Sequence, residues 1–114
     1  MAGMRYEGAG PRGYGQAPLL PSVEVDIAGG AGDTTLTADE YPYPVLILTG
    51  VKTGNRGVIL PTTENGTWLV INNSSGAFTT TIKTTAGTGP DVANDKSAFV
   101  RCDGTDIVRV TGDA

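Results

Sequence analysis

Two loops rich in carboxylates have the greatest potential for chemistry in this sequence. One holds Asp91 and Asp95, and the other holds Asp103 and Asp106 around Gly104. Carboxylate oxygens are the ligands that hard cations such as Ca²⁺ prefer. However, the spacing of a calcium loop with its terminal Glu is absent, and turn geometry alone explains an Asp-Gly pair. We therefore predict neither a metal site nor a cofactor.

The absence of histidine excludes most familiar catalytic mechanisms. The chain has no His and one Cys, so Ser-His-Asp and Cys-His catalysis and His-ligated metals all lack an imidazole. The lone Cys102 cannot form an intrachain disulfide, and its place in an alternating apolar run predicts a buried core residue. The single tryptophan, Trp68, is likewise predicted to anchor the core, with an exposed ligand platform as the alternative. We predict that the protein is not an enzyme.

The charge balance excludes further classes of function. Eight basic and twelve acidic residues give a net charge of −4, whereas a nucleic-acid binder needs a basic face. The longest uninterrupted apolar stretch, residues 45–48, is far below the roughly 20 residues of a membrane span. No apolar signal-peptide core follows Arg5. We expect a protein made in the cytoplasm that binds neither nucleic acid nor membrane.

The first 20 residues differ from the rest in composition. They hold five of the 17 glycines and have no repeating apolar face, which predicts an extended, flexible N-terminal arm at 1–20 before a β-domain at 21–114. The arm also holds Arg5, Tyr6, Arg12 and Tyr14, residue types that anchor interfaces. Its net charge is +1 against −5 for residues 21–114, which suits docking on an acidic neighbour.

From residue 21 onward the pattern is one of short β-type runs separated by turn residues. We predict about eight strands, at 23–27, 34–37, 45–49, 57–61, 67–71, 78–83, 98–102 and 105–110. This spacing is typical of an all-β antiparallel sandwich or a jelly-roll-like barrel. The run 45–49 is predicted to be central, and hairpins are predicted at Asn65-Gly66 and Asp103-Gly104. No internal repeat is visible, which argues against a solenoid.

Two further arginines are candidates for a subunit interface. Arg101 and Arg109 fall on the two strands of the predicted terminal hairpin, so we expect both to project from one face. Arginine is enriched at protein interfaces and pairs well with carboxylates. A solvated sheet surface is the alternative.

Four segments of the second half carry a resemblance to a known class of protein. They are VILP at 58–61, GTWLVINNSSG at 66–76, TIKT at 81–84 and FVRCDGT at 99–105. Together they resemble a β-domain of tailed-bacteriophage structural proteins, which occurs in small capsid decoration (cement) proteins and in tail-fibre or baseplate modules. The resemblance covers about half of the chain and implies an assembly role without an active site.

Among these phage proteins, a small body with an arm is most similar to a head decoration protein. The resemblance implies that it lies on the capsid exterior of the virion, binds the major capsid protein and itself as a homotrimer, and stabilises contacts between capsomers. One alternative is a tail-fibre, baseplate or receptor-binding component that recognises a host surface glycan. Another is a small hydrolase or cation-dependent module that uses the four loop carboxylates named above.

Overall fold

The computed structural model describes residues 20–62 and 66–110 of the 114-residue chain. Within these ranges the protein is all-β with eight strands, and no helix there could span a membrane. The predicted fold class and strand number are confirmed at this level. The strands are β1 (Ser22–Asp26), β2 (Gly32–Thr35), β3 (Val45–Thr49), β4 (Arg56–Ile59), β5 (Thr67–Asn72), β6 (Thr80–Lys83), β7 (Ser97–Cys102) and β8 (Ile107–Arg109).

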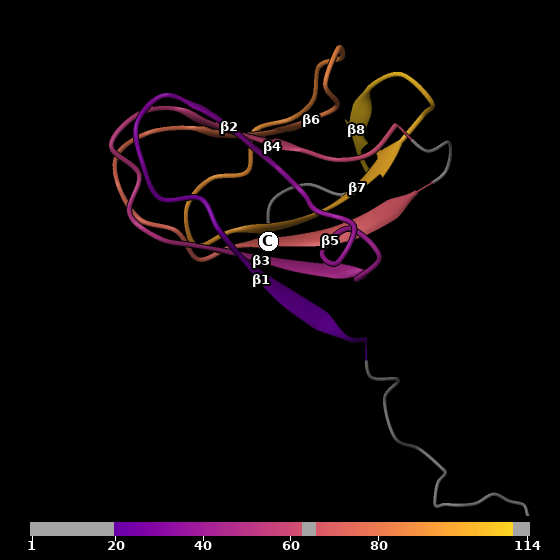
Figure 1. Cartoon of the computed structure of the whole chain (residues 1–114), viewed down its shortest axis with the longest axis horizontal. Helices are drawn as coiled ribbons and strands as arrows, with labels where there is room; N and C mark the ends of the chain where they lie inside the picture. The colour runs from indigo at the N-terminus through magenta and orange to yellow at the C-terminus, as the bar shows by residue number, and fades with distance from the viewer. Residues whose placement is uncertain (1–19, 63–65, 111–114) are drawn as a thin grey trace, which may run out of the picture.

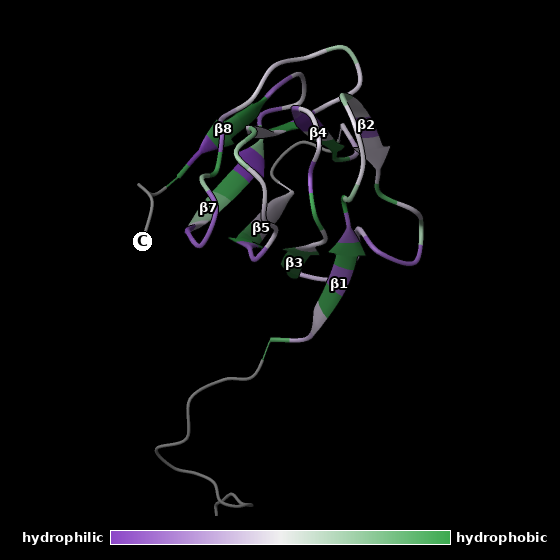
Figure 2. Ribbon diagram, turned by 90° about the vertical axis from the view of Figure 1, so that its left-hand side faces the viewer, coloured by the Kyte–Doolittle hydropathy of each residue, from purple (hydrophilic) through white to green (hydrophobic). Residues whose placement is uncertain are grey.

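The strands form two sheets that lie one above the other (Figure 1). The larger sheet has the order β1-β3-β5-β7-β8 and the smaller has β2-β4-β6; Figure 2 shows the larger sheet's strands side by side in this order. Four of the six strand pairings are parallel, and only β5–β7 and β7–β8 are antiparallel. The two stacked sheets agree with the predicted sandwich, but the predicted antiparallel pairing is wrong for the first six strands. The prediction that 45–49 is central is confirmed, since β3 lies between β1 and β5.

Successive strands alternate between the two sheets, so the chain winds as a coil. Strands β1 and β2 form the first turn, β3 and β4 the second, and β5 and β6 the third. Partners in neighbouring turns are 23 or 24 residues apart, as in Val25↔Leu48 and Val58↔Ile82. This is a short parallel β-solenoid closed by a β7–β8 hairpin, so the expectation against a solenoid is wrong.

The repeat is not visible in the sequence because equivalent positions of the three turns hold different residues. The inward position held by Val25 in the first turn is Leu48 in the second and Asn72 in the third. A parallel pairing of this kind requires only side chains that fit the interior, together with turns that bring the chain back into register. With three short turns, no recurring letter pattern emerges.

One of the two predicted hairpins is present. β7 and β8 pair antiparallel, with Cys102 opposite Ile107, and residues 103–106 connect them. The hairpin predicted at Asn65-Gly66 is wrong, because the strands on either side of it, β4 and β5, belong to different sheets. A local turn signal cannot reveal whether the chain folds back on its own strand or crosses to the other sheet.

The inward faces of the two sheets form the core. Trp68 is 5% exposed and Cys102 is fully buried, which confirms both as core residues. They pack in one cluster with side chains from the smaller sheet such as Val58 and Ile82. The indole Nε1 of Trp68 also donates a hydrogen bond to the carbonyl oxygen of Tyr41 at 2.9 Å. Trp68 therefore ties the segment between β2 and β3 to the core.

Glycine is required where the turns of the coil pass each other. Gly50 and Gly76 both have positive φ, at 104° and 102°, a region that residues with a side chain rarely adopt. A Cβ at Gly76 would run into the carbonyl oxygen of Lys52 in the neighbouring turn. The turns can stack this closely only because no side chain intervenes.

Candidate functional site

The corner between β3 and β4 buries a lysine. Lys52 is 2% exposed, although it belongs to the most solvent-seeking residue type. Its Nζ donates hydrogen bonds to Ser74 Oγ at 3.1 Å and to Thr80 Oγ1 at 3.0 Å, and a third to Asn94 Oδ1. The ammonium therefore joins three later segments of the chain: the corner before β6, β6 itself and the segment before β7.

A chain of buried polar groups surrounds this ammonium. Asn72 Oδ1 accepts hydrogen bonds from the backbone N–H of Ser74 at 3.0 Å and from its hydroxyl, while Asn72 Nδ2 donates to the carbonyl of Val92 at 2.8 Å. Asn94 Nδ2 donates to the carbonyl of Gly76 at 2.8 Å. The polar side chains thus satisfy backbone groups at the corners of the coil, where no sheet ladder can do so.

Burial lowers the pKa of Lys52, because the charged form loses its hydration. All three hydrogen bonds found for its ammonium go to neutral oxygens. An ammonium has three N–H donors, so none is left to bind a ligand, and a protonated amine has no lone pair with which to attack a substrate. The arrangement is suited to holding the coil together and not to catalysis.

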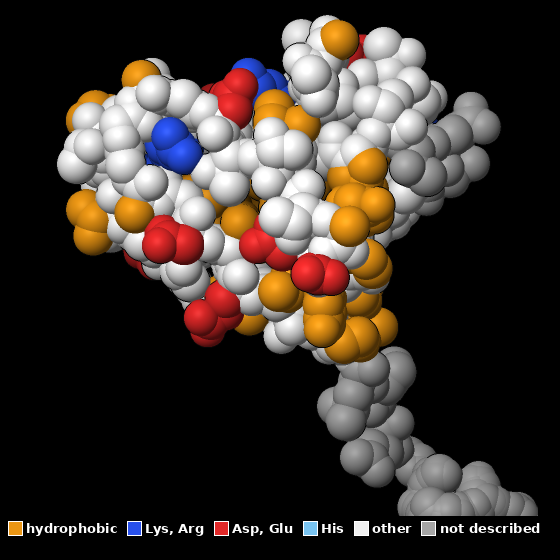
Figure 3. All heavy atoms as spheres, viewed as in Figure 1, with side chains coloured by type: hydrophobic (Ala, Val, Ile, Leu, Met, Phe, Trp, Pro, Cys, Tyr) orange, Lys and Arg blue, Asp and Glu red, His pale blue; other side chains and the backbone are white. Residues whose placement is uncertain are grey.

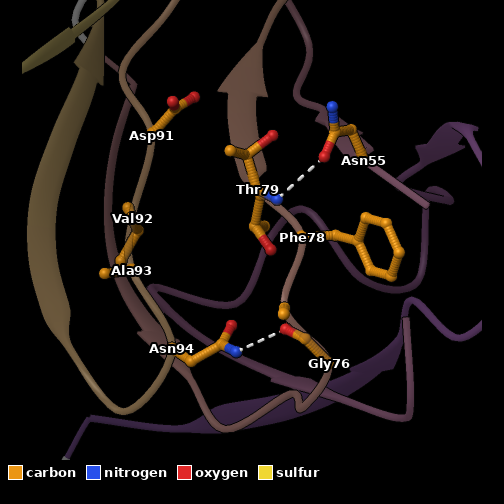
Figure 4. Close-up of a pocket in the computed structure, with 10 residues that line it drawn as sticks. Asn55, Gly76, Phe78, Thr79, Asp91, Val92, Ala93 and Asn94 are labelled. Carbon is orange, nitrogen blue, oxygen red and sulfur yellow. Dashed lines mark hydrogen bonds between the residues drawn. The ribbon is translucent and has the colours of Figure 1, made fainter. Parts of the chain in front are cut away.

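An open pocket of about 640 Å³ lies beside this corner (Figure 4). Several of its polar side chains are hydrogen-bonded within the chain. Asn55 Oδ1 accepts a hydrogen bond from the N–H of Thr79 at 3.1 Å, and Asp91 Oδ1 accepts one from the Thr81 hydroxyl at 2.5 Å. Figure 4 shows the ring of Phe78 turned away from Asp91. The aromatic ring and the carboxylate therefore do not converge on one point of the pocket, as they would in a typical sugar site.

The predicted carboxylate loops have structural roles. Asp103 Oδ1 accepts hydrogen bonds from the N–H groups of Thr105 at 3.0 Å and Asp106 at 2.8 Å, and these bonds lower the pKa of Asp103. The Asp106 carboxylate in turn accepts a hydrogen bond from the N–H of Thr88 at 2.8 Å. Across residues 20–62 and 66–110, no three metal-ligating side chains come together.

The expectation that Arg101 and Arg109 share a face is wrong. In the hairpin Arg101 is opposite Val108, and Arg109 is opposite the fully buried Val100. Directly opposed residues share a face, so Arg109 lies on the inward side, where it donates to the carbonyl of Asp91, and Arg101 lies on the outward side. The one-residue offset arises because the four residues 103–106 set the register.

The arm residues Arg5, Tyr6, Arg12 and Tyr14 lie outside the described part of the chain. The same holds for most of the predicted arm at 1–20, of which only Leu20 is described. The interface role of these residues stays a prediction.

A feature that sequence reasoning missed is an apolar surface on the larger sheet. Side chains that point away from the core on β3, β5, β7 and β8 form what we name the outer apolar face: Ile47, Leu69, Ile71, Phe99 and Val108. Phe99 is exposed and the other four are half-buried, while Val45, which also points outward, is buried. The signal was present in the run 45–48, which is apolar at every position and not at alternate ones. A strand of this kind is apolar on both faces, so its outward face also needs a covering.

Comparison with known proteins identifies no relative. No protein-family model, no curated protein and no solved structure matches the chain. Function must therefore be inferred from the residues and their geometry.

Proposed function

We propose that the protein is a virion structural protein of a tailed bacteriophage, a head decoration protein that binds the outside of an icosahedral capsid and stabilises contacts between capsomers as a trimer. One observation carries the assembly role: the five-stranded sheet has an apolar outer face that is partly exposed, with Phe99 at 39%. A contiguous apolar surface on a small protein marks a contact with another macromolecule. The phage location rests on the resemblance of the four sequence segments.

The mechanism of such a protein is added interface area. Each copy contributes contacts that exist only in the assembled shell, so binding stabilises that state by mass action. Contacts that are individually weak add up when they are repeated around the shell. The coil supplies a rigid body for this purpose, because each turn is hydrogen-bonded to the next along both sheets.

The copy number in purified particles tests the proposal. Quantitative mass spectrometry should find this chain in hundreds of copies, near one per major capsid protein. A handful of copies per particle would contradict a decoration role. A deletion of residues 1–20 should leave the β-domain folded and reduce its attachment to capsids.

A tail-fibre or baseplate module is the second candidate, and the ends of the coil favour it. Among the described residues, β1 and β2 each pair on one side only, so the first turn leaves both sheets open at the same end there. A parallel coil is extended by adding turns at such an edge, which is how a shaft could continue. A handful of copies, located at the tail by labelling, would support this candidate.

A further inference from the structure

We infer that a second, smaller pocket binds one neutral sugar residue, with the ring of Tyr41 as its platform. This site goes beyond the proposed function, because stabilisation of a shell by added interface area needs no ligand. The residues that line the pocket, and the hydrogen-bonding groups that they leave open, support this class of ligand.

The pocket lies where the three strands of the smaller sheet end. β2, β4 and β6 run parallel, so their carboxyl ends meet at one edge of the sheet. Thr35 is the last residue of β2, while Thr62 and Thr85 follow the ends of β4 and β6. We name this site the threonine pocket. It has a volume of about 170 Å³, and its lining consists of these three threonines, Tyr41 and four apolar residues: Leu36, Ile59, Leu60 and Pro61.

The lining of the threonine pocket suits a neutral ligand. None of the described residues that line it is charged, so an ion would lose its hydration there without gaining an opposite charge. Leu36, Ile59 and Leu60 are almost fully buried and form an apolar floor. A sugar ring presents C–H groups to such a floor and hydroxyl groups to the threonines around it.

The hydroxyl groups at the pocket are open. Within residues 20–62 and 66–110, four lining residues have side-chain hydroxyls that make no hydrogen bond: Thr35, Tyr41, Thr62 and Thr85. A hydroxyl both donates and accepts, so four such groups match a ligand that is itself rich in hydroxyls. The larger pocket differs, since several of its polar side chains are hydrogen-bonded within the chain.

Tyr41 is held in place by its backbone and not by its ring. Its carbonyl oxygen accepts the hydrogen bond from Trp68 Nε1, and its N–H donates to the carbonyl oxygen of Thr37 at 3.1 Å. The residue is nonetheless 38% exposed. Figure 3 shows hydrophobic side chains exposed where the segment between β2 and β3 lies and where β1 begins. An exposed ring on a fixed backbone offers a stacking surface that loses little freedom on binding.

The affinity of a single site should be low. One sugar residue makes few contacts, so we expect a dissociation constant in the millimolar range. Weak sites of this kind become effective on a particle that carries many copies of the protein, because the copies then bind one glycan-covered surface together.

The experiment titrates the ¹⁵N-labelled full chain with methyl glycosides of glucose, galactose, mannose and N-acetylglucosamine and follows the amide NMR signals. At least one of these sugars should shift the signals of the four residues with open hydroxyls. Tyr41→Ala should weaken this binding at least about tenfold, while its backbone hydrogen bonds stay in place. The matched control is Tyr43→Ala, which removes a ring that is 37% exposed outside the pocket and should leave binding unchanged.

Removal of single hydroxyls tests the polar contacts separately from the ring. Thr62→Val and Thr85→Val keep the shape of the side chain and should each weaken binding about two- to tenfold. Thr53→Val changes an exposed threonine at the corner between β3 and β4 and should have no effect. Wild-type affinity in both pocket variants would overturn the role of the hydroxyls.

Other outcomes would overturn the site itself. These are no shift with any of the four sugars, shifts confined to other parts of the chain, or wild-type binding by Tyr41→Ala. Equal losses in Tyr41→Ala and Tyr43→Ala would overturn the role of the ring. A proline-rich peptide that shifts the same signals where the sugars do not would overturn the class of ligand.

Failure of this inference can be separated from failure of the proposed function. The number of copies per particle tests decoration and does not depend on the pocket. Sugar binding by a chain present in a handful of copies would contradict decoration alone, whereas hundreds of copies of a chain that binds none of the sugars would contradict the sugar site alone.

Discussion

Replacement of the buried ammonium of Lys52 by an apolar side chain tests whether the polar corner stabilises the coil. Lys52→Met keeps most of the aliphatic stem and removes the donor to Ser74, Thr80 and Asn94. Ser74 keeps its hydrogen bond to Asn72, so its hydroxyl remains satisfied. Thr80 Oγ1 loses its ammonium donor in a buried setting, and Asn94 Oδ1, which is part-buried, keeps only the long bond from Asn72 Nδ2 at 3.5 Å.

The magnitude follows from those two acceptors. An unsatisfied buried acceptor costs about 1–3 kcal/mol, so the two together cost about 2–6 kcal/mol. Part of this loss is offset, because removing the ammonium also removes the cost of burying its charge. We expect the free energy of unfolding to fall by about 2–3 kcal/mol at neutral pH, which for a domain of this size lowers Tm by about 10 °C or more.

Urea unfolding followed by the fluorescence of the single tryptophan, Trp68, measures this loss, since its indole is buried in the folded chain. The matched control is Lys96→Met, which removes an exposed lysine and should change stability by no more than about 0.5 kcal/mol. Addition of Thr80→Val to Lys52→Met should recover part of the loss, because an apolar pair leaves no acceptor unpaired. If Lys52→Met unfolds at the same urea concentration as wild type or above it, the network does not stabilise the coil.

Because the pKa of Lys52 is lowered, the difference in the free energy of unfolding between wild type and Lys52→Met should depend on pH. The folded chain releases this proton at a lower pH than the unfolded chain, whose lysine keeps its ordinary pKa of 10.5. Between these two pH values the unfolded chain binds more protons, so the free energy of unfolding rises with pH across that window. Below the folded pKa the full cost of burying the charge is present. Lys52→Met should lack this rise.

Three further substitutions test the coil and its core. Gly76→Ala should destabilise the fold by about 3 kcal/mol or more, and Gly29→Ala by about 1–2 kcal/mol. Both glycines have positive φ, but only a Cβ at Gly76 would meet backbone atoms. Equal urea midpoints for the two variants would contradict the close stacking of turns. Trp68→Phe should lose about 1–2 kcal/mol in denaturation followed by circular dichroism, since its bond to the Tyr41 carbonyl disappears; an unchanged midpoint would refute that tie. The Cys102 thiol should react with a thiol reagent only on unfolding, so rapid stoichiometric labelling of the native chain would contradict its burial.

The sequence by itself determined the features that depend on neighbouring residues. The eight strands were found close to their observed bounds, because apolar alternation and glycine-rich turns are local signals. The hairpin at Asp103-Gly104 was found for the same reason, since its turn is closed by bonds between residues no more than three apart. The burial of Trp68 and Cys102 followed from their strand positions.

Only the tertiary structure decided how those strands associate. Parallel partners are 23 or 24 residues apart, and no local signal distinguishes a strand that folds back on its neighbour from one that crosses to the opposite sheet. From the sequence, Lys52 would be predicted to lie on the surface. Its burial depends on the fold, which places Asn94, 42 residues later, against its ammonium. The faces of Arg101 and Arg109 depended on hairpin register, where a shift of one residue exchanges inside and outside. Contacts between distant segments thus set the polar corner and the outer apolar face, because burial and pairing depend on the whole chain.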